Sequence, residues 1–130
     1  MTERIAFPKS VREKILNHLL GRCSYCGIEL DIFNSVIEHQ FPLCKGGTNE
    51  RFNLVPSCNY CNSRKGRKSI YEFWQTLNNN PDIEWLKRAG CNYQMYSLED
   101  NEYVFHFYYE YAYDQDLYIP LDREDEYAKI

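Results

Sequence analysis

VIEHQFPLCKGGTNERFNLVPSCNYCNSRKGRK, residues 36–68, is the stretch from which the fold of this 130-residue chain can be predicted. Its apolar pattern and turn residues predict a short strand at 35–39 and a second short strand at 53–57. The loop between them is expected to bend at Gly46 and Gly47. A helix should begin just after the second strand and cover 60–65. Strand, loop, strand and helix would then converge on one point.

Two CxxC pairs flank this predicted unit: Cys23 with Cys26, and Cys58 with Cys61. A CxxC turn lets two thiolates reach one ion with little strain, and two such turns complete a tetrahedral four-cysteine zinc site. Such a site is closed to water and is therefore structural. Accidental spacing or a redox CxxC motif is the alternative interpretation.

Glu38 and His39 are neighbours on the first predicted strand, so their side chains should point to opposite faces. The zinc would bring both of them close to Asn53 and Asn62. A local twist or a β-bulge is expected to direct the acid and the imidazole to a common ion. A lone histidine in this position would more often be a core residue held by hydrogen bonds.

Residues 22–69 resemble the HNH endonuclease family, because CxxC, acid–His, GG, NL, CxxCN and K-G occur in the order of that family. The resemblance implies a ββα-metal (His-Me finger) fold. It implies that His39 is the general base and that Asn53 supports the loop and orients the histidine. Glu38 and Asn62 would hold a catalytic Mg²⁺ or Mn²⁺. The chain departs from the common pattern in two places: Glu38 stands where Asp is usual, and Asn62 where the family name has His.

The residue types agree with hydrolysis of a phosphodiester, which needs a deprotonated water and stabilisation of charge on phosphate and leaving oxygen. An imidazole, with an ordinary pKa of about 6.5, can take the proton at neutral pH. A divalent ion on carboxylate and amide oxygens would suit Mg²⁺ or Mn²⁺ and would stabilise the leaving oxygen. By the resemblance, the products would carry 5′-phosphate and 3′-hydroxyl ends.

Cations cluster beside this predicted site, where they would contact phosphates without reading sequence. A solvated basic face is the alternative for each of them. The candidate nucleic-acid-binding residues are Lys45, Arg51, Arg64, Lys65, Arg67 and Lys68.

Outside the resemblance, a capping box at Ser10 and Glu13 predicts a helix over 11–20. A second capping box starts a helix at 69 that runs to about 77, and Pro81 marks a further helix start. The period-two aromatics of 103–113 predict a strand. This strand and the acidic end are expected to be core plus a solvated terminus. Alternatives are a homodimer or protein-partner surface, or an acidic segment that competes with DNA.

The length of 130 residues fits one domain, and the resemblance implies that this α+β domain over 1–130 has a core at 22–75 and a C-terminal extension at 76–130. Residues 1–90 hold 13 basic and 9 acidic side chains, whereas residues 91–130 hold 2 and 10. The front of the chain therefore suits a nucleic-acid partner. No apolar run is long enough for a membrane span, and without a signal-like segment the chain is expected to be cytoplasmic.

The sequence thus predicts a ββα-metal (His-Me finger) core stapled by a four-cysteine zinc, with an N-terminal helix and C-terminal helices plus an aromatic strand. The expected function is a metal-dependent DNA endonuclease that uses one metal and a histidine base, in restriction or antiviral defence. One alternative is a zinc-stabilised module that binds nucleic acid or protein without cleavage. Another is an effector subunit that is active only with a partner.

Overall fold

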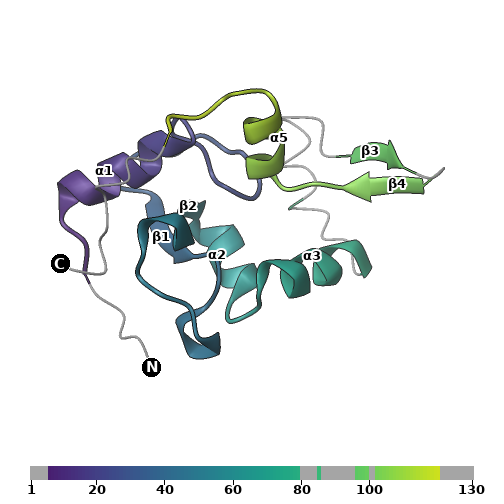
Figure 1. Ribbon diagram of the computed structural model, residues 1–130, viewed down its shortest axis with the longest axis horizontal. Helices are drawn as coiled ribbons and strands as arrows, with labels where there is room; N and C mark the ends of the chain where they lie inside the picture. The colour runs from purple at the N-terminus through teal and green to yellow at the C-terminus, as the bar shows by residue number, and fades with distance from the viewer. Residues whose placement is uncertain (1–5, 80–84, 86–95, 100–101, 121–130) are drawn as a thin grey trace.

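The two strands predicted around the central loop form one antiparallel hairpin with a helix directly after it (Figure 1). The computed structural model describes residues 6–79, 85, 96–99 and 102–120. The helices are α1 (Lys9–His18), α2 (Asn59–Lys65), α3 (Ile70–Asn79) and α5 (Tyr108–Asp114), with short 3-10 turns at Leu43–Lys45 and Arg51–Asn53. The strands are β1 (Ser35–His39), β2 (Leu54–Cys58), β3 (Tyr96–Glu99) and β4 (Glu102–Phe105). The α+β class predicted from the sequence is confirmed.

The β1–β2 hairpin has an unbroken register, in which Glu38 pairs with Val55 and His39 pairs with Leu54. The ladder therefore contains no bulge, which was one of the two expectations for this strand, the other being a local twist. Gly46 adopts a left-handed φ of 90°, and a Cβ on Gly47 would lie 2.0 Å from the carbonyl oxygen of Phe41. The predicted bend at the two glycines is confirmed, because only glycine fits this close approach.

Helix α1 begins earlier than predicted. The amides of Val11 and Arg12 both donate to the carbonyl of Pro8, which lies at the N-cap, and Ser10 is inside the helix. The predicted Ser10 capping box is therefore wrong. The capping box of α3 is confirmed, since Ser69 N donates to Glu72 Oε1 at 3.1 Å and Glu72 N donates to Ser69 Oγ at 3.2 Å.

The long aromatic strand predicted at 103–113 is wrong in its second half. Strand β4 ends at Phe105, and α5 starts at Tyr108. At the start of α5, the amide of Phe107 donates a hydrogen bond of 2.6 Å to Glu110 Oε2. Tyr108 and Ala112 are buried four residues apart, as a helix requires. Aromatic residues at every second position are also spaced four apart, so the same pattern fits both a strand and one face of a helix.

Residues 117–119, which precede the acidic residues of the C-terminus, pack onto the body of the protein. Leu117 N donates to Ala112 O at 2.8 Å, and Ile119 N donates to His18 O at 2.9 Å. The acidic residues beyond 120 lie outside the described residues. The helix start expected at Pro81 lies outside the described residues.

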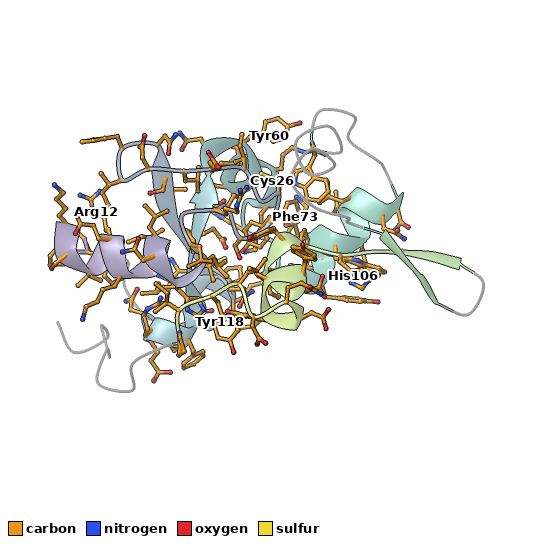
Figure 2. All side chains as sticks on the ribbon, turned by 90° about the horizontal axis from the view of Figure 1, so that it is seen from above. Arg12, Cys26, Tyr60, Phe73, His106 and Tyr118 are labelled. Atoms are coloured by element: carbon orange, nitrogen blue, oxygen red, sulfur yellow. The ribbon has the colours of Figure 1, made fainter. Side chains whose placement is uncertain are left out.

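The main core surrounds the CxxC turns and takes aromatic side chains from several elements, with Phe73, Trp85 and Phe107 fully or almost fully buried. Figure 2 shows Cys26 and Phe73 near the middle of the molecule and Arg12 at the outer side of α1. Among the described residues, no helix has the length and apolar character needed to cross a bilayer.

Candidate functional site

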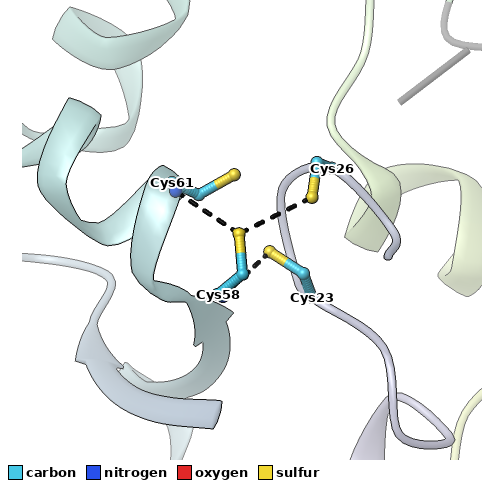
Figure 3. A group of neighbouring side chains, drawn as sticks. All are labelled: Cys23, Cys26, Cys58 and Cys61. Carbon is cyan, nitrogen blue, oxygen red and sulfur yellow. Dashed lines mark hydrogen bonds between the residues drawn. The ribbon is translucent and has the colours of Figure 1, made fainter. Parts of the chain in front are cut away.

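The four cysteines of the two CxxC pairs converge in the core (Figure 3). Their sulfurs all lie within 4.8 Å of one another, and Cys26 Sγ is 3.8 Å from Cys58 Sγ. A tetrahedral ion with metal–sulfur bonds of about 2.3 Å places its sulfurs about 3.8 Å apart. The thiols Cys23, Cys26, Cys58 and Cys61 therefore fit one tetrahedral metal ion.

Two backbone amides and one indole surround the sulfurs of this cluster. Cys58 N lies 3.4 Å from Cys23 Sγ, and Cys61 N lies 3.4 Å from Cys58 Sγ. The indole Nε1 of Trp85 donates to Cys61 Sγ at 3.2 Å. Hydrogen bonds, first with Cys23 and then with the other thiols, lower the pKa of Cys58 and raise the pKa of Cys61. A divalent cation would stabilise all four thiolates together.

Glu38 contributes a buried carboxylate, 5% exposed, to the interface between β1 and α2. Lys65 Nζ, at the end of α2, donates to Glu38 Oε1 at 2.8 Å and to the carbonyl of His39 at 3.2 Å. The hydroxyl of Tyr25 donates to the second oxygen, Oε2. Both oxygens of the predicted metal ligand are therefore hydrogen-bonded within the fold.

Tyr25 joins the CxxC turn to this carboxylate. Burial first, and then the charge of Glu38 and the hydrogen bond to it, raise the pKa of Tyr25 well above its ordinary value. The phenol therefore stays protonated and donates. Its ring packs edge-on against Phe73 and Phe107, with centroids 5.5 and 5.2 Å away.

His39 points to the face of the hairpin opposite Glu38, as neighbouring strand residues must. Its Nε2 lies 2.8 Å from Asn49 Oδ1, and both side chains are 4% exposed. An amide oxygen only accepts, so Nε2 carries the hydrogen in this arrangement. The contact ties the imidazole to the loop between the strands.

Asn53 organises that loop from its other end. Its Nδ2 donates to Phe41 O at 2.9 Å and to Thr48 O at 2.8 Å, while its Oδ1 accepts from Phe41 N at 2.7 Å. Asn53 therefore links Phe41 and Thr48 across the loop. The direct contact with the imidazole comes from Asn49 instead.

Asn62 lies in α2, one turn before Lys65, and is half-buried. Residues three apart on a helix share a face, so Asn62 lies on the same face of α2 as Lys65, which contacts Glu38. A carboxylate and an amide oxygen are suitable donors for Mg²⁺ or Mn²⁺. The donor set therefore fits a divalent ion, although the ammonium of Lys65 already interacts with Glu38.

Two of the candidate nucleic-acid contacts are buried side chains. Lys65 is 0% exposed and bound to Glu38. Arg51 is 7% exposed, and its Nη1 donates to the carbonyl of Leu54 at 2.9 Å. Neither side chain is on the surface to meet a phosphate. Both cations are hydrogen-bonded inside the fold.

The remaining candidates reach the surface to different degrees. Arg67 is exposed, whereas Arg64 and Lys68 are half-buried, and Lys68 Nζ donates to Arg64 O at 3.4 Å. Lys45 forms an ion pair with Glu72. The hydrogen bond from Lys45 first, and then those from Ser69, lower the pKa of Glu72 to about 2.

Three site residues lacked an assigned role in the sequence interpretation: Tyr25, Asn49 and Lys65 as a partner of Glu38. Tyr25 and Tyr60 occupy the same position in the two CxxC pairs, and the sequence does not indicate which of them contacts Glu38. Asn49 follows the double glycine at a position where loops commonly carry asparagine. Lys65 lies in a run of basic residues, so the sequence did not distinguish this buried cation from its more exposed neighbours.

Comparison with known proteins agrees with this geometry. Residues 23–78 match the family model described as HNH endonuclease. The CRISPR-associated endonuclease Cas9 of Corynebacterium diphtheriae is 44% identical over 70 residues, which cover 53% of this chain and 5% of that protein. The chain thus spans a small part of this curated relative.

A solved structure shares the fold. The crystal structure of the Type II-C Cas9 enzyme from Actinomyces naeslundii superimposes with a TM-score of 0.51 and 24% sequence identity. The match covers 71% of this chain and 11% of that chain. At this level of identity the likeness shows the fold alone.

Proposed function

We propose, from the premise that residues 23–78 of this chain belong to the HNH endonuclease family, that the protein is a metal-dependent DNA endonuclease. The observation that carries the proposal is the meeting of β1 and α2. Lys65, one turn after Asn62, reaches Glu38 at 2.8 Å and the His39 carbonyl at 3.2 Å. Helix α2 therefore lies against the Glu38 side chain and the backbone of His39.

In this proposal His39 is the general base. Nε2 faces the oxygen of Asn49, which leaves Nδ1 as the nitrogen that takes a proton from the attacking water. Nδ1 is buried. Water therefore reaches it after a local rearrangement of the segments that pack on the imidazole, which substrate binding could provide.

Glu38 and Asn62 would hold Mg²⁺ or Mn²⁺, and Cys23, Cys26, Cys58 and Cys61 would hold zinc. The catalytic ion, when bound, supplies charge stabilisation for the phosphate and the leaving oxygen. Zinc would fix the turn that precedes β1 to the start of α2. Lys45, Arg64, Arg67 and Lys68 would contact the phosphates of DNA.

A role in restriction or antiviral defence remains part of the proposal, and its support is the name of the curated relative, a CRISPR-associated endonuclease. A second candidate function is a zinc-stabilised binding module that does not cleave. The observation that favours it is that Lys65 and Tyr25 already hydrogen-bond both oxygens of Glu38.

Plasmid nicking distinguishes the two candidates. The wild-type protein, with its zinc content measured, is assayed with no added divalent ion, with Mg²⁺ and with Mn²⁺. Nicking that requires the added ion and is lost in His39→Ala, but kept in the control His106→Ala, supports the endonuclease. DNA binding by a folded, zinc-loaded protein that never nicks would support the binding module.

A further inference from the structure

We propose that Tyr25 is a positioning residue through which the metal-binding CxxC turn sets the orientation of the Glu38 carboxylate. The inference rests on the proposed function, in which Glu38 holds a divalent ion. It adds a physical link between two sites that otherwise have separate tasks. The Tyr25 side chain alone spans from the CxxC turn to Glu38.

The first step is the position of Tyr25. It lies between Cys23 and Cys26, so every atom of its backbone belongs to the turn that carries two thiols. Ser24 N donates to Pro56 O at 2.9 Å, which fastens the same turn to β2. The hydroxyl of Tyr25 then reaches Glu38 Oε2 on β1.

The second step is the rigidity of the phenol. Tyr25 is 0% exposed and is packed between aromatic rings. Its carbonyl accepts a hydrogen bond of 3.0 Å from Tyr108 N, and the carbonyl of Ser24 accepts one of 2.8 Å from Tyr109 N. The turn and the surrounding rings therefore confine the phenol, so that its hydroxyl has one position from which to donate to Glu38.

The third step is the direction of the other oxygen. With Oε2 fixed by Tyr25, Oε1 faces α2, where Lys65 Nζ meets it at 2.8 Å. Asn62 lies on the same helix, one turn earlier. Tyr25 thus presents Oε1 to the helix that carries the second proposed ligand. Without the hydroxyl, the carboxylate could rotate and lose this alignment.

The test compares Tyr25→Phe with Tyr60→Phe, which makes the same chemical change at the same position of the other CxxC pair. Zinc content and the thermal unfolding midpoint establish that each variant keeps its staple. Mn²⁺ binding is then titrated by electron paramagnetic resonance of the free ion. The nicking assay gives the Mn²⁺ concentration for half-maximal rate and the KM for plasmid.

We expect Tyr25→Phe to bind Mn²⁺ about tenfold more weakly, as is typical for loss of a hydrogen bond to a metal ligand. The KM for DNA should stay the same, and Tyr60→Phe should behave as wild type. In a Glu38→Asp background, whose side chain is one methylene shorter and is expected to lose the contact with the phenol, adding Tyr25→Phe should change Mn²⁺ binding no further.

Equal Mn²⁺ binding by Tyr25→Phe and wild type overturns the inference, as does full additivity with Glu38→Asp. Loss of zinc from Tyr25→Phe also counts against it, because the phenol would then act on the staple rather than on Glu38. A wild-type protein that neither binds Mn²⁺ nor nicks DNA removes the proposed function and this inference with it. Normal wild-type nicking with an unaffected Tyr25→Phe removes the inference alone.

Discussion

The imidazole Nε2 of His39 lies 2.8 Å from the amide oxygen of Asn49, and this contact is buried. It connects the last residue of β1 to the loop that follows the double glycine. In the proposed mechanism, the contact selects the nitrogen that acts as base. The loop therefore helps to define the reactive form of the histidine.

We expect Asn49→Ala to lower kcat for nicking about tenfold or more, because a general base that is free to rotate loses part of its effect of about 10²–10⁴-fold. The KM for plasmid should stay within about twofold of wild type, since Asn49 is buried away from solvent. The measurement is a kcat and KM determination with saturating Mg²⁺. Asn59→Ala, an exposed asparagine, is the control. An equal loss in both variants would contradict the assignment.

Zinc removal should unfold the protein. The four thiols lie in the main core, and structural zinc contributes about 10–16 kcal/mol in small metal-dependent domains. This is of the same order as the whole stability of a typical domain, about 5–15 kcal/mol. We expect Cys61→Ser to lose both its zinc and its cooperative thermal transition, as followed by elemental analysis and circular dichroism.

The control for this prediction is Cys44→Ser, which removes a free, exposed thiol. It should keep about one zinc per chain and an unchanged unfolding midpoint. Cooperative unfolding of metal-free Cys61→Ser near the wild-type temperature would show that the core is stable without the staple.

The central unit was predictable because its signals are local. Strand pattern, double glycine and CxxC spacing each constrain a few neighbouring residues, and the confirmed hairpin and thiol cluster follow from them. Burial was harder to predict. Lys65 belongs to the same basic run of the sequence as Arg67 and Lys68, and nothing in that run marks it as different. In the fold Lys65 is inside, because helix periodicity turns it toward Glu38.

The C-terminal aromatics could not be assigned from their spacing alone. Tyr109, Tyr111 and Tyr113 suit a strand with period two, but Tyr109 and Tyr113 also pack edge to face at i, i+4, with ring centroids 6.1 Å apart. The decisive factor is tertiary: Phe107 and Tyr108 fill space beside Tyr25, and the chain becomes helical there. The spacing of residues in the sequence does not indicate that these side chains pack beside Tyr25.

Lys65→Met should be strongly destabilising, although it replaces a cation with an apolar side chain of similar length. It leaves the buried carboxylate of Glu38 without its ammonium partner, and breaking a buried pair in this way costs about 3–5 kcal/mol. Urea unfolding of the zinc-loaded protein measures the change. The double variant Glu38→Gln with Lys65→Met should recover part of the loss, because no unpaired charge remains.

Lys68→Met is the matched control, three residues further along the chain and half-buried. A surface substitution of this kind changes stability by about 0.5 kcal/mol or less. If the two lysine variants were equally stable, the Glu38–Lys65 pair would not be a significant part of the core.

The surface cations after α2 should determine the salt dependence of DNA binding. Each phosphate contact that is removed lowers the slope of log K against log salt by about 0.9. We therefore expect Arg67→Gln and Lys68→Gln each to reduce the slope by about one, as measured by fluorescence anisotropy with a duplex in the absence of divalent ions. Arg12→Gln, on the outer side of α1, is the control and should leave the slope unchanged (Figure 2). Equal slopes for all three variants would mean that DNA does not bind preferentially along this end of α2.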